Sequence, residues 1–241
     1  MLRSLRNQLQ FLRQYYEQFE TTGAIAPSSR FLARSMTRFL AARERQHAVQ
    51  VLEIGPGTGA VTDQIVRLLG PDDRLDLVEL NDQFIRILEE RFASDPVWAK
   101  VRSQVQIHQQ PVQEYSGPAG DFVISGLPLN NFPLALVQEI RQTYLRLVRS
   151  GGVLSYFEYM YIRTVRRRIS RGSDRTRIIG IDELLGELCE RHRICRDSVW
   201  LNLPPAWVQH LRLPGIVTDE QTGNGPADTA GSDQERPDAS G

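Results

Sequence analysis

Short apolar runs alternate with amphipathic stretches along most of the chain, from about residue 49 onward. Continuous apolar runs are typical of strands that are buried on both faces. The stretches between them carry apolar residues three or four positions apart, as helices do. We expect strands at residues 51–54, 75–79, 105–107, 122–125 and 153–157. We expect helices at residues 61–69, 83–92, 134–148 and 181–191.

Strands that alternate with helices form a parallel sheet with helices on both faces, so the expected fold is α/β and Rossmann-like. Two further segments, residues 194–201 and 206–213, are separated by Pro204 and Pro205. Prolines at this position favour a turn. These two segments are therefore predicted to close the sheet as an antiparallel pair.

The N-terminal segment carries six apolar side chains that are spaced alternately three and four positions apart. They are Leu2, Leu5, Leu9, Leu12, Tyr16 and Phe19. This spacing predicts an amphipathic helix, which either lies in a membrane interface or packs over the following domain. Residues 23–29 interrupt the helix, and Ser28 or Ser29 then offers an N-cap for a second one.

The 241 residues carry 29 basic and 29 acidic side chains, which gives a formal net charge of zero. The charges are spread unevenly, with a local balance of +5 over residues 1–45, +6 over residues 163–177 and −5 over residues 215–241. The last segment has too few apolar residues to fold and is predicted to be a disordered acidic tail. The chain therefore divides into a helical membrane or lid segment (1–46), an α/β domain (47–214) and the tail.

No run approaches the roughly 18 consecutive apolar residues that a membrane-spanning helix needs, and no signal-peptide core is visible. Two cysteines cannot build a disulfide framework and suit a reducing compartment. Cys189, His192 and Cys195 are spaced C-x-x-H-x-x-C but lack a fourth ligand, so no metal site is expected. We expect a cytoplasmic protein that lies peripherally on the inner face of the cell membrane, where its basic segments meet anionic lipid.

The first predicted strand runs directly into a glycine-rich turn, EIGPGTG, that precedes a helix. Gly55, Gly57 and Gly59 allow tight turning and close approach of a ligand to the main chain. Such a turn binds dinucleotides in some folds. The acid before the turn, Glu53, would repel a pyrophosphate and attract the ammonium of a methionine moiety, so the turn favours S-adenosylmethionine (SAM).

Two further strand ends carry candidate ligand contacts. Glu79 ends the second predicted strand, where a carboxylate either accepts hydrogen bonds from ribose hydroxyls or caps the helix that begins near Asp82. Residues 125–133 follow the fourth strand, and ligands of open α/β sheets lie beyond the carboxyl ends of the strands. We expect Ser125 to contact the cofactor and Pro128 to stiffen a loop whose carbonyls accept hydrogen bonds from an incoming amine.

The segments VLEIGPGTG, LVEL and SGLPL resemble class I SAM-dependent methyltransferases. GAIAPSSRFLARSM, SGLPLNNFP and LPPAWV are further similar to the bacterial phospholipid N-methyltransferase family. Its members methylate the amine of phosphatidylethanolamine, and close relatives act on ornithine lipid. The resemblance implies an enzyme that N-methylates a membrane aminolipid, up to the trimethylated form, with Glu53, Gly55, Gly57 and Glu79 holding the cofactor.

The resemblance also implies which residues contact the substrate amine. Tyr159 and Glu158 are the candidates for orienting or deprotonating it, helped by the carbonyls of Gly126 and Leu127. Glu158 departs from the family pattern as an added carboxylate, which favours a cationic headgroup without a phosphate, such as ornithine lipid. Substrate contacts are expected from Tyr15, Tyr16, Ser28, Ser29, Arg30 and Pro128. Either of the two N-terminal tyrosines could instead pack in a core or an interface.

Gln110 stands in the region where relatives place an acid for the adenine amino group, and its side-chain carbonyl accepts the same hydrogen bond. The rRNA adenine dimethyltransferases share the architecture but carry Asn-Leu-Pro-Tyr where this chain has residues 126–129, GLPL. Without the tyrosine a flipped adenine loses its stacking partner, so no nucleic-acid partner is expected. The other alternative is a SAM-binding protein of the membrane surface that is not catalytic.

Overall fold

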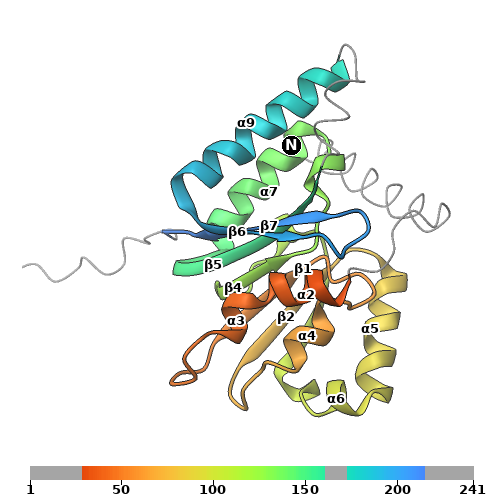
Figure 1. Cartoon of the computed structure of the whole chain (residues 1–241). Coiled ribbons are helices and arrows are strands. Elements are labelled where there is room, and N and C mark those ends of the chain that lie inside the picture. Colours follow the sequence, from red (N-terminus) through yellow and green to blue (C-terminus); the bar gives the residue numbers. More distant parts are fainter. Residues whose placement is uncertain (1–28, 161–172, 215–241) are drawn as a thin grey trace, which may run out of the picture.

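The computed structural model describes residues 29–160 and 173–214. A seven-stranded sheet in the order β3-β2-β1-β4-β5-β7-β6 runs through the middle of the molecule (Figure 1). The strands are β1 (Gln50–Ile54), β2 (Arg74–Glu79), β3 (Val105–Gln109), β4 (Gly120–Ser125), β5 (Val148–Tyr159), β6 (Arg193–Val199) and β7 (Ala206–Arg212).

The five strands β1 to β5 are parallel, and β7 pairs antiparallel with both β5 and β6. This arrangement confirms the predicted Rossmann-like α/β sheet and its closing antiparallel pair. β1 lies between β2 and β4, in the middle of the five parallel strands. The chain crosses from one half of the sheet to the other at this strand, which is where open α/β sheets bind their ligands.

Helices cover both faces of the sheet (Figure 1). The longer helices α7 and α9 lie on one face, and the remaining α-helices lie on the other. The α-helices are α2 (Arg30–Met36), α3 (Arg38–Ala41), α4 (Thr62–Val66), α5 (Asp82–Ser94), α6 (Pro96–Ala99), α7 (Leu134–Leu147) and α9 (Ser173–His192). Short 3-10 helices are η1 (Arg102–Gln104), η2 (Val112–Glu114) and η3 (Leu129–Asn131).

Each face of the sheet has its own hydrophobic cluster. One joins the sheet to α7 and α9 and includes Tyr144 and Leu188. The other joins it to α2, α4 and α5 and includes Leu32 and Trp98. Because the inner parallel strands are covered on both faces, they carry apolar side chains at consecutive positions, such as residues 122–124 of β4, and these short runs located them.

The segment that precedes β1 packs on the sheet. Ser29 caps α2 as predicted, since its Oγ accepts a hydrogen bond from Leu32 N at 3.2 Å. Met36 is 1% exposed. Arg43 forms a buried ion pair with Asp73 at the start of β2. Residues 30–43 are thus tied to the α/β core, and the division of the chain at residue 46 stays a prediction.

Several boundaries differ from those predicted. α4 ends at Val66 rather than at residue 69, and β5 extends from Val148 to Tyr159 beyond the predicted 153–157. The predicted helix 181–191 is the second half of α9, which begins at Ser173. The N-terminal amphipathic helix, residues 163–172 of the basic segment and the acidic tail lie outside the described residues. No helix in the described part is long and apolar enough to cross a membrane.

Candidate active site

The carboxyl ends of the parallel strands bring the predicted motifs to one edge of the sheet. In the strand registers Ile54 lies opposite Val78 on β2 and Ser125 on β4. Ser125 in turn lies opposite Tyr156 on β5. The glycine turn, the loop after β4 and the end of β5 are therefore neighbours, as the sequence predicts.

The glycine turn contacts the loop after β4 through its main chain. Gly126 N donates to Ile54 O at 2.8 Å, and a Cβ added to Gly126 would lie 2.5 Å from the carbonyl oxygen of Gly55. No residue with a side chain fits at Gly126 without moving that backbone. At Gly57 the φ of +56° favours glycine, yet nothing lies within 4 Å of an added Cβ. The turn thus leaves open space in front of Gly57, where a ligand can approach the main chain.

Glu79 holds the glycine turn from the neighbouring strand. Its Oε2 accepts a hydrogen bond from Gly57 N at 3.1 Å, and its Oε1 accepts from Leu80 N and Asn81 N at 2.7 and 2.9 Å. Burial raises the pKa of this carboxyl, and the three backbone donors oppose that rise. Asn81, rather than Glu79, caps α5 through its own side chain. Glu79 is therefore placed as a buried acceptor at the turn.

Glu53 lies beneath the same turn and is 2% exposed. Its Oε2 accepts a hydrogen bond from the Thr62 hydroxyl of α4 at 2.7 Å. Burial, together with the nearby charge of Glu79, raises the pKa of Glu53 from 4.5 to about 8, while the Thr62 hydrogen bonds lower it. At neutral pH this carboxyl is mainly protonated, and a cation placed beside it would favour the charged form. Thr62 was not identified from the sequence.

A cleft opens between the ends of β1, β2 and β3 and the loop after β4. Four of its lining residues are predicted site residues, namely Gly55, Glu79, Gln110 and Leu127. Its other walls are mostly apolar and include Val78, Leu80, Pro111, Val112 and Ile140. An apolar slot with a carboxylate and a glutamine in its lining suits a nucleoside, whose base needs flat apolar walls and whose ribose needs an acceptor.

Ser125, the last residue of β4, holds the loop after β4 through hydrogen bonds. Its Oγ lies 2.6 Å from the Tyr144 hydroxyl of α7, and it accepts a hydrogen bond from Leu127 N at 3.3 Å. Ser125 and Tyr144 are 0% and 1% exposed, and burial raises the pKa of Tyr144. The structure thus gives Ser125 contacts that fix the Gly126–Leu127 backbone. Tyr144 is a partner that the sequence pattern did not reveal.

The two candidate groups for the amine lie next to each other on β5 but on opposite faces of the sheet. Glu158 is 5% exposed, and its Oε2 accepts a hydrogen bond from Gln209 Nε2 at 3.4 Å. Tyr159 packs with its ring 5.1 Å from that of Phe157, and burial raises its pKa. Successive strand residues point to opposite faces, so Glu158 shares the α7 face with Leu127, and Tyr159 lies on the α2 face.

The predicted substrate residues lie at separate places. Ser29 caps α2, and its main-chain N–H donates to Asn202 Oδ1 at 3.0 Å. Arg30 is exposed, with its guanidinium carbon 4.9 Å from the centre of the Phe31 ring. Pro128 precedes η3 and accepts a hydrogen bond from Asn131 N at 2.9 Å. Tyr15, Tyr16 and Ser28 lie outside the described residues.

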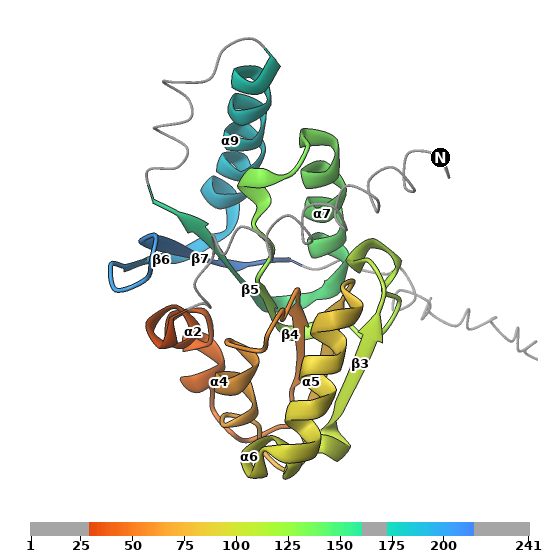
Figure 2. The ribbon, with the colours of Figure 1, turned by 90° about the vertical axis from the view of Figure 1, so that its right-hand side faces the viewer.

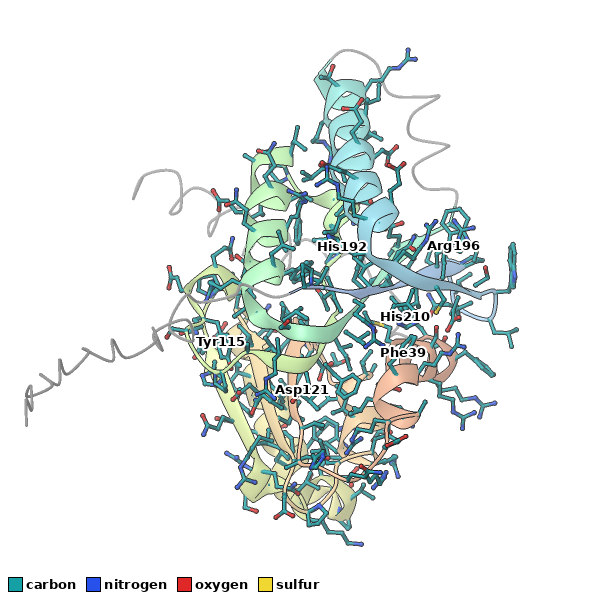
Figure 3. The ribbon with its side chains drawn as sticks, turned by 90° about the vertical axis from the view of Figure 1, so that its left-hand side faces the viewer. Phe39, Tyr115, Asp121, His192, Arg196 and His210 are labelled. Atoms are coloured by element: carbon teal, nitrogen blue, oxygen red, sulfur yellow. The ribbon has the colours of Figure 1, made fainter. Side chains whose placement is uncertain are left out.

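The cysteines do not come together. Cys189 lies on α9 with its Sγ 3.2 Å from the Tyr156 hydroxyl. Cys195, on the edge strand β6, has its Sγ within 4.8 Å of ligand atoms of Asp197 and His210, and His210 faces Phe39 with ring centres 5.0 Å apart (Figure 3). Arg38 Nη1 lies 2.6 Å from Asp197 Oδ1, so a guanidinium already supplies the positive charge at this group.

Comparison with known proteins agrees with this geometry. No family model matches the chain. The ornithine lipid N-methyltransferase of Singulisphaera acidiphila is 30% identical over 160 residues, which are 65% of this chain and 82% of that protein. The ribosomal RNA small subunit methyltransferase A of Parasynechococcus marenigrum is 35% identical over 95 residues, but these are only 39% of this chain and 30% of that protein.

Solved structures share the fold at lower identity. An O-methyltransferase from Streptomyces achromogenes, in complex with SAM, has a TM-score of 0.55 at 20% identity, over 86% of this chain and 89% of its own. An O-methyltransferase from Bacillus cereus, in complex with SAH, has a TM-score of 0.54 at 15% identity, over 86% and 90%. Fold, site and relatives together define a class I methyltransferase that uses SAM as its methyl donor. Within this class, the chain belongs to the family of the Singulisphaera ornithine lipid N-methyltransferase.

Proposed function

We propose that the protein N-methylates the amine headgroup of a membrane aminolipid, and that ornithine lipid is the preferred substrate. The observation that carries the proposal is the 30% identity to an ornithine lipid N-methyltransferase across 82% of that protein. The site supports it, because the glycine turn, Glu79 and the loop after β4 meet at one cleft.

On this proposal the cofactor is held by the cleft residues that the sequence singled out. Glu79 accepts hydrogen bonds from the ribose hydroxyls, and the carbonyl of Gln110 accepts one from the adenine amino group. Glu53 lies beneath the turn with its pKa raised to about 8, and it ionises when the ammonium of the methionine moiety binds nearby. When bound, SAM supplies a methyl group on a sulfonium, which a neutral amine accepts in an in-line displacement.

On this proposal, residues of the loop after β4 and of the end of β5 bind and deprotonate the substrate amine. The carbonyls of Gly126 and Leu127 orient the amine by accepting its N–H hydrogen bonds. Glu158 lies on the same face of the sheet as Leu127 and serves as the proton acceptor. Its buried carboxylate also opposes a phosphate at this place, since two anions in a low dielectric repel each other strongly. This favours ornithine lipid over phosphatidylethanolamine.

Lipid mass spectrometry tests the proposal directly. The chain is expressed in a bacterial host that makes ornithine lipid and phosphatidylethanolamine, alongside Glu79→Gln and the matched control Glu89→Gln, which replaces an exposed glutamate on α5. We expect methylated ornithine lipid with the wild type and with Glu89→Gln, and a loss of at least about tenfold with Glu79→Gln. Unchanged pools of both lipids in the wild-type strain would show that the proposal is wrong.

A second candidate is adenine methylation of RNA, which the partial matches to rRNA small subunit methyltransferases favour. Against it, Leu129 stands where the adenine enzymes carry a tyrosine, and it is 2% exposed within the α7 cluster. A buried leucine offers no ring on which a flipped base can stack. Incorporation of labelled methyl groups into 16S rRNA rather than lipid would support this candidate instead.

A further inference from the structure

The loop that joins β6 to β7 carries an unusual concentration of exposed apolar side chains. Of the four large hydrophobic residues exposed in residues 29–160 and 173–214, three lie in this loop. Trp200 is 61% exposed, Leu201 69% and Leu203 77%. A cluster of large exposed apolar side chains on a folded domain marks an interaction surface. We call Trp200, Leu201 and Leu203 the hairpin tip.

The backbone of the hairpin tip is held in place from inside. Asn202 is 6% exposed, its Oδ1 accepts a hydrogen bond from Ser29 N at 3.0 Å, and its Nδ2 donates to Pro204 O at 2.8 Å. Pro205 O accepts a further hydrogen bond from Met160 N at 2.7 Å. Because Asn202 is buried and hydrogen-bonded, these contacts fix the loop in a conformation that exposes its apolar side chains.

The loop between β6 and β7 projects beyond α2 (Figure 2). β7 runs antiparallel to β5, with Ala206 opposite Tyr159. The residues that precede Ala206 therefore lie at the carboxyl end of the parallel strands, where Gly55 and Gly126 also lie. A lipid surface that meets this edge would contact the hairpin tip and face the cleft at the same time.

Basic residues flank the hairpin tip. α2, whose N-cap residue Ser29 is bonded to Asn202, exposes Arg30 and Arg34. Between α2 and the tip lies an open groove to which Phe31, Trp200 and Leu201 contribute apolar side chains. Tryptophan and leucine beside arginines is the composition of segments that lie in the interface of an anionic membrane.

We propose that the hairpin tip inserts into the interface of an anionic bilayer, with Arg30 and Arg34 on lipid phosphates, and so turns the cofactor cleft toward the headgroups. The inference builds on the proposed function, because a lipid headgroup can be methylated only if this edge faces the membrane. It adds a second membrane contact to the predicted N-terminal helix, at the point where that segment joins the domain.

The test measures membrane binding and catalysis separately. The full chain, the triple variant Trp200→Ser/Leu201→Ser/Leu203→Ser and the control Ile194→Ser are sedimented with vesicles of phosphatidylcholine and phosphatidylglycerol, without SAM. Ile194 is 40% exposed on β6 but lies at the opposite edge of the sheet. We expect about tenfold weaker vesicle binding for the triple variant and unchanged binding for Ile194→Ser.

Methylation is then compared on vesicle-borne ornithine lipid and on a water-soluble short-chain analogue. The triple variant should lose activity on vesicles about tenfold and keep wild-type activity on the soluble analogue. In the wild type, brominated phosphatidylcholine should quench tryptophan emission, and Trp200→Phe should remove most of that quenching while vesicle binding is kept.

Other occupants of the tip give different results. If the triple variant binds vesicles as the wild type does, the inference is overturned. In that case, a triple variant with lower thermal stability than the wild type would indicate that residues 1–28 cover the tip. A triple variant with a different mass from the wild type in size-exclusion chromatography would indicate a contact between two copies. If the wild type methylates neither lipid form, the proposed function fails alone, because vesicle binding without SAM still decides the role of the tip.

Discussion

Replacing Glu53 with glutamine should make the unliganded protein more stable at alkaline pH and weaken its binding of SAM. Glu53 is buried, and its pKa is raised from 4.5 to about 8. Between these values the unfolded chain has released a proton that the folded protein keeps. The stability that Glu53 contributes is therefore fully present below pH 4.5 and is lost as the pH rises toward about 8.

The size of the effect follows from the two pKa values. Between pH 5.5 and pH 8, a carboxyl with these values lowers the free energy of unfolding by about 3 kcal/mol. Glutamine does not titrate and can still accept a hydrogen bond from the Thr62 hydroxyl. The stability of Glu53→Gln relative to the wild type should therefore rise by about 3 kcal/mol over this pH range.

Urea unfolding at a series of pH values measures this difference, and all other titrating groups are shared by the two proteins. Calorimetry of SAM binding at pH 7 in buffers of different ionisation enthalpy gives a second readout. The wild type should release about one proton on binding, because the ammonium favours the Glu53 carboxylate, and Glu53→Gln should release none. A stability difference that stays constant with pH would refute the reasoning, since Glu53 would then be ionised in the folded protein.

Three further predictions concern the frame around the site. Asp73→Ala removes the buried partner of Arg43 and should lower the free energy of unfolding by about 3–5 kcal/mol in urea titrations. Asp82→Ala is the control, because it breaks an exposed pair with Arg86. It should lower the free energy of unfolding by less than about 1 kcal/mol. Tyr144→Phe leaves Ser125 without its hydroxyl partner, so we expect a loss of about 1 kcal/mol in stability and a raised KM for SAM. Truncation after Pro214 removes six acidic side chains and one arginine; methylation should persist and sedimentation with anionic vesicles should increase, whereas lost activity would show that the tail is structural.

The strands and the residues at their ends were predictable because one local signal determines both. A strand buried on both faces is a continuous apolar run, and a polar residue at its carboxyl end, such as Glu79, then marks the ligand edge of the sheet. The ends of elements were harder to predict. Leu68 and Leu69 continue the apolar pattern of α4 and pack against the core, but they lie beyond its last turn, in the connection that leads to β2 at Arg74.

Partners that are distant in sequence were not predictable from pattern. Ser125 and Tyr144 are 19 residues apart, and Ser29 and Asn202 are 173 apart. Each pair exists only because the sheet places its elements side by side. The same limit applies to the hairpin tip, since residues 194–201 were predicted as one strand, yet β6 ends at Val199 and Trp200 is 61% exposed.

Gly57 and Gly126 are glycines for different reasons: Gly57 has a positive φ, and Gly126 has no room for a side chain. Alanine substitutions distinguish the two cases. Gly57→Ala meets an unfavourable φ of +56° but no steric contact, so it should lower the stability of the unliganded protein by only about 1–2 kcal/mol. Gly126→Ala places a Cβ 2.5 Å from the Gly55 carbonyl oxygen. Because that contact forces two loops apart, the expected loss is larger, about 2–3 kcal/mol or more.

SAM affinity shows whether the cofactor occupies the space beside Gly57. If SAM occupies the open space in front of Gly57, a methyl group there should weaken SAM binding at least about tenfold, more than its small effect on stability implies. Gly186→Ala is the matched control, since it adds a methyl group in the middle of α9 with nothing within 4 Å, and it should stabilise the protein by up to about 1 kcal/mol without changing affinity. Wild-type affinity in Gly57→Ala would place the methionine moiety away from the turn, because a ligand in contact with that main chain cannot share its space with a Cβ.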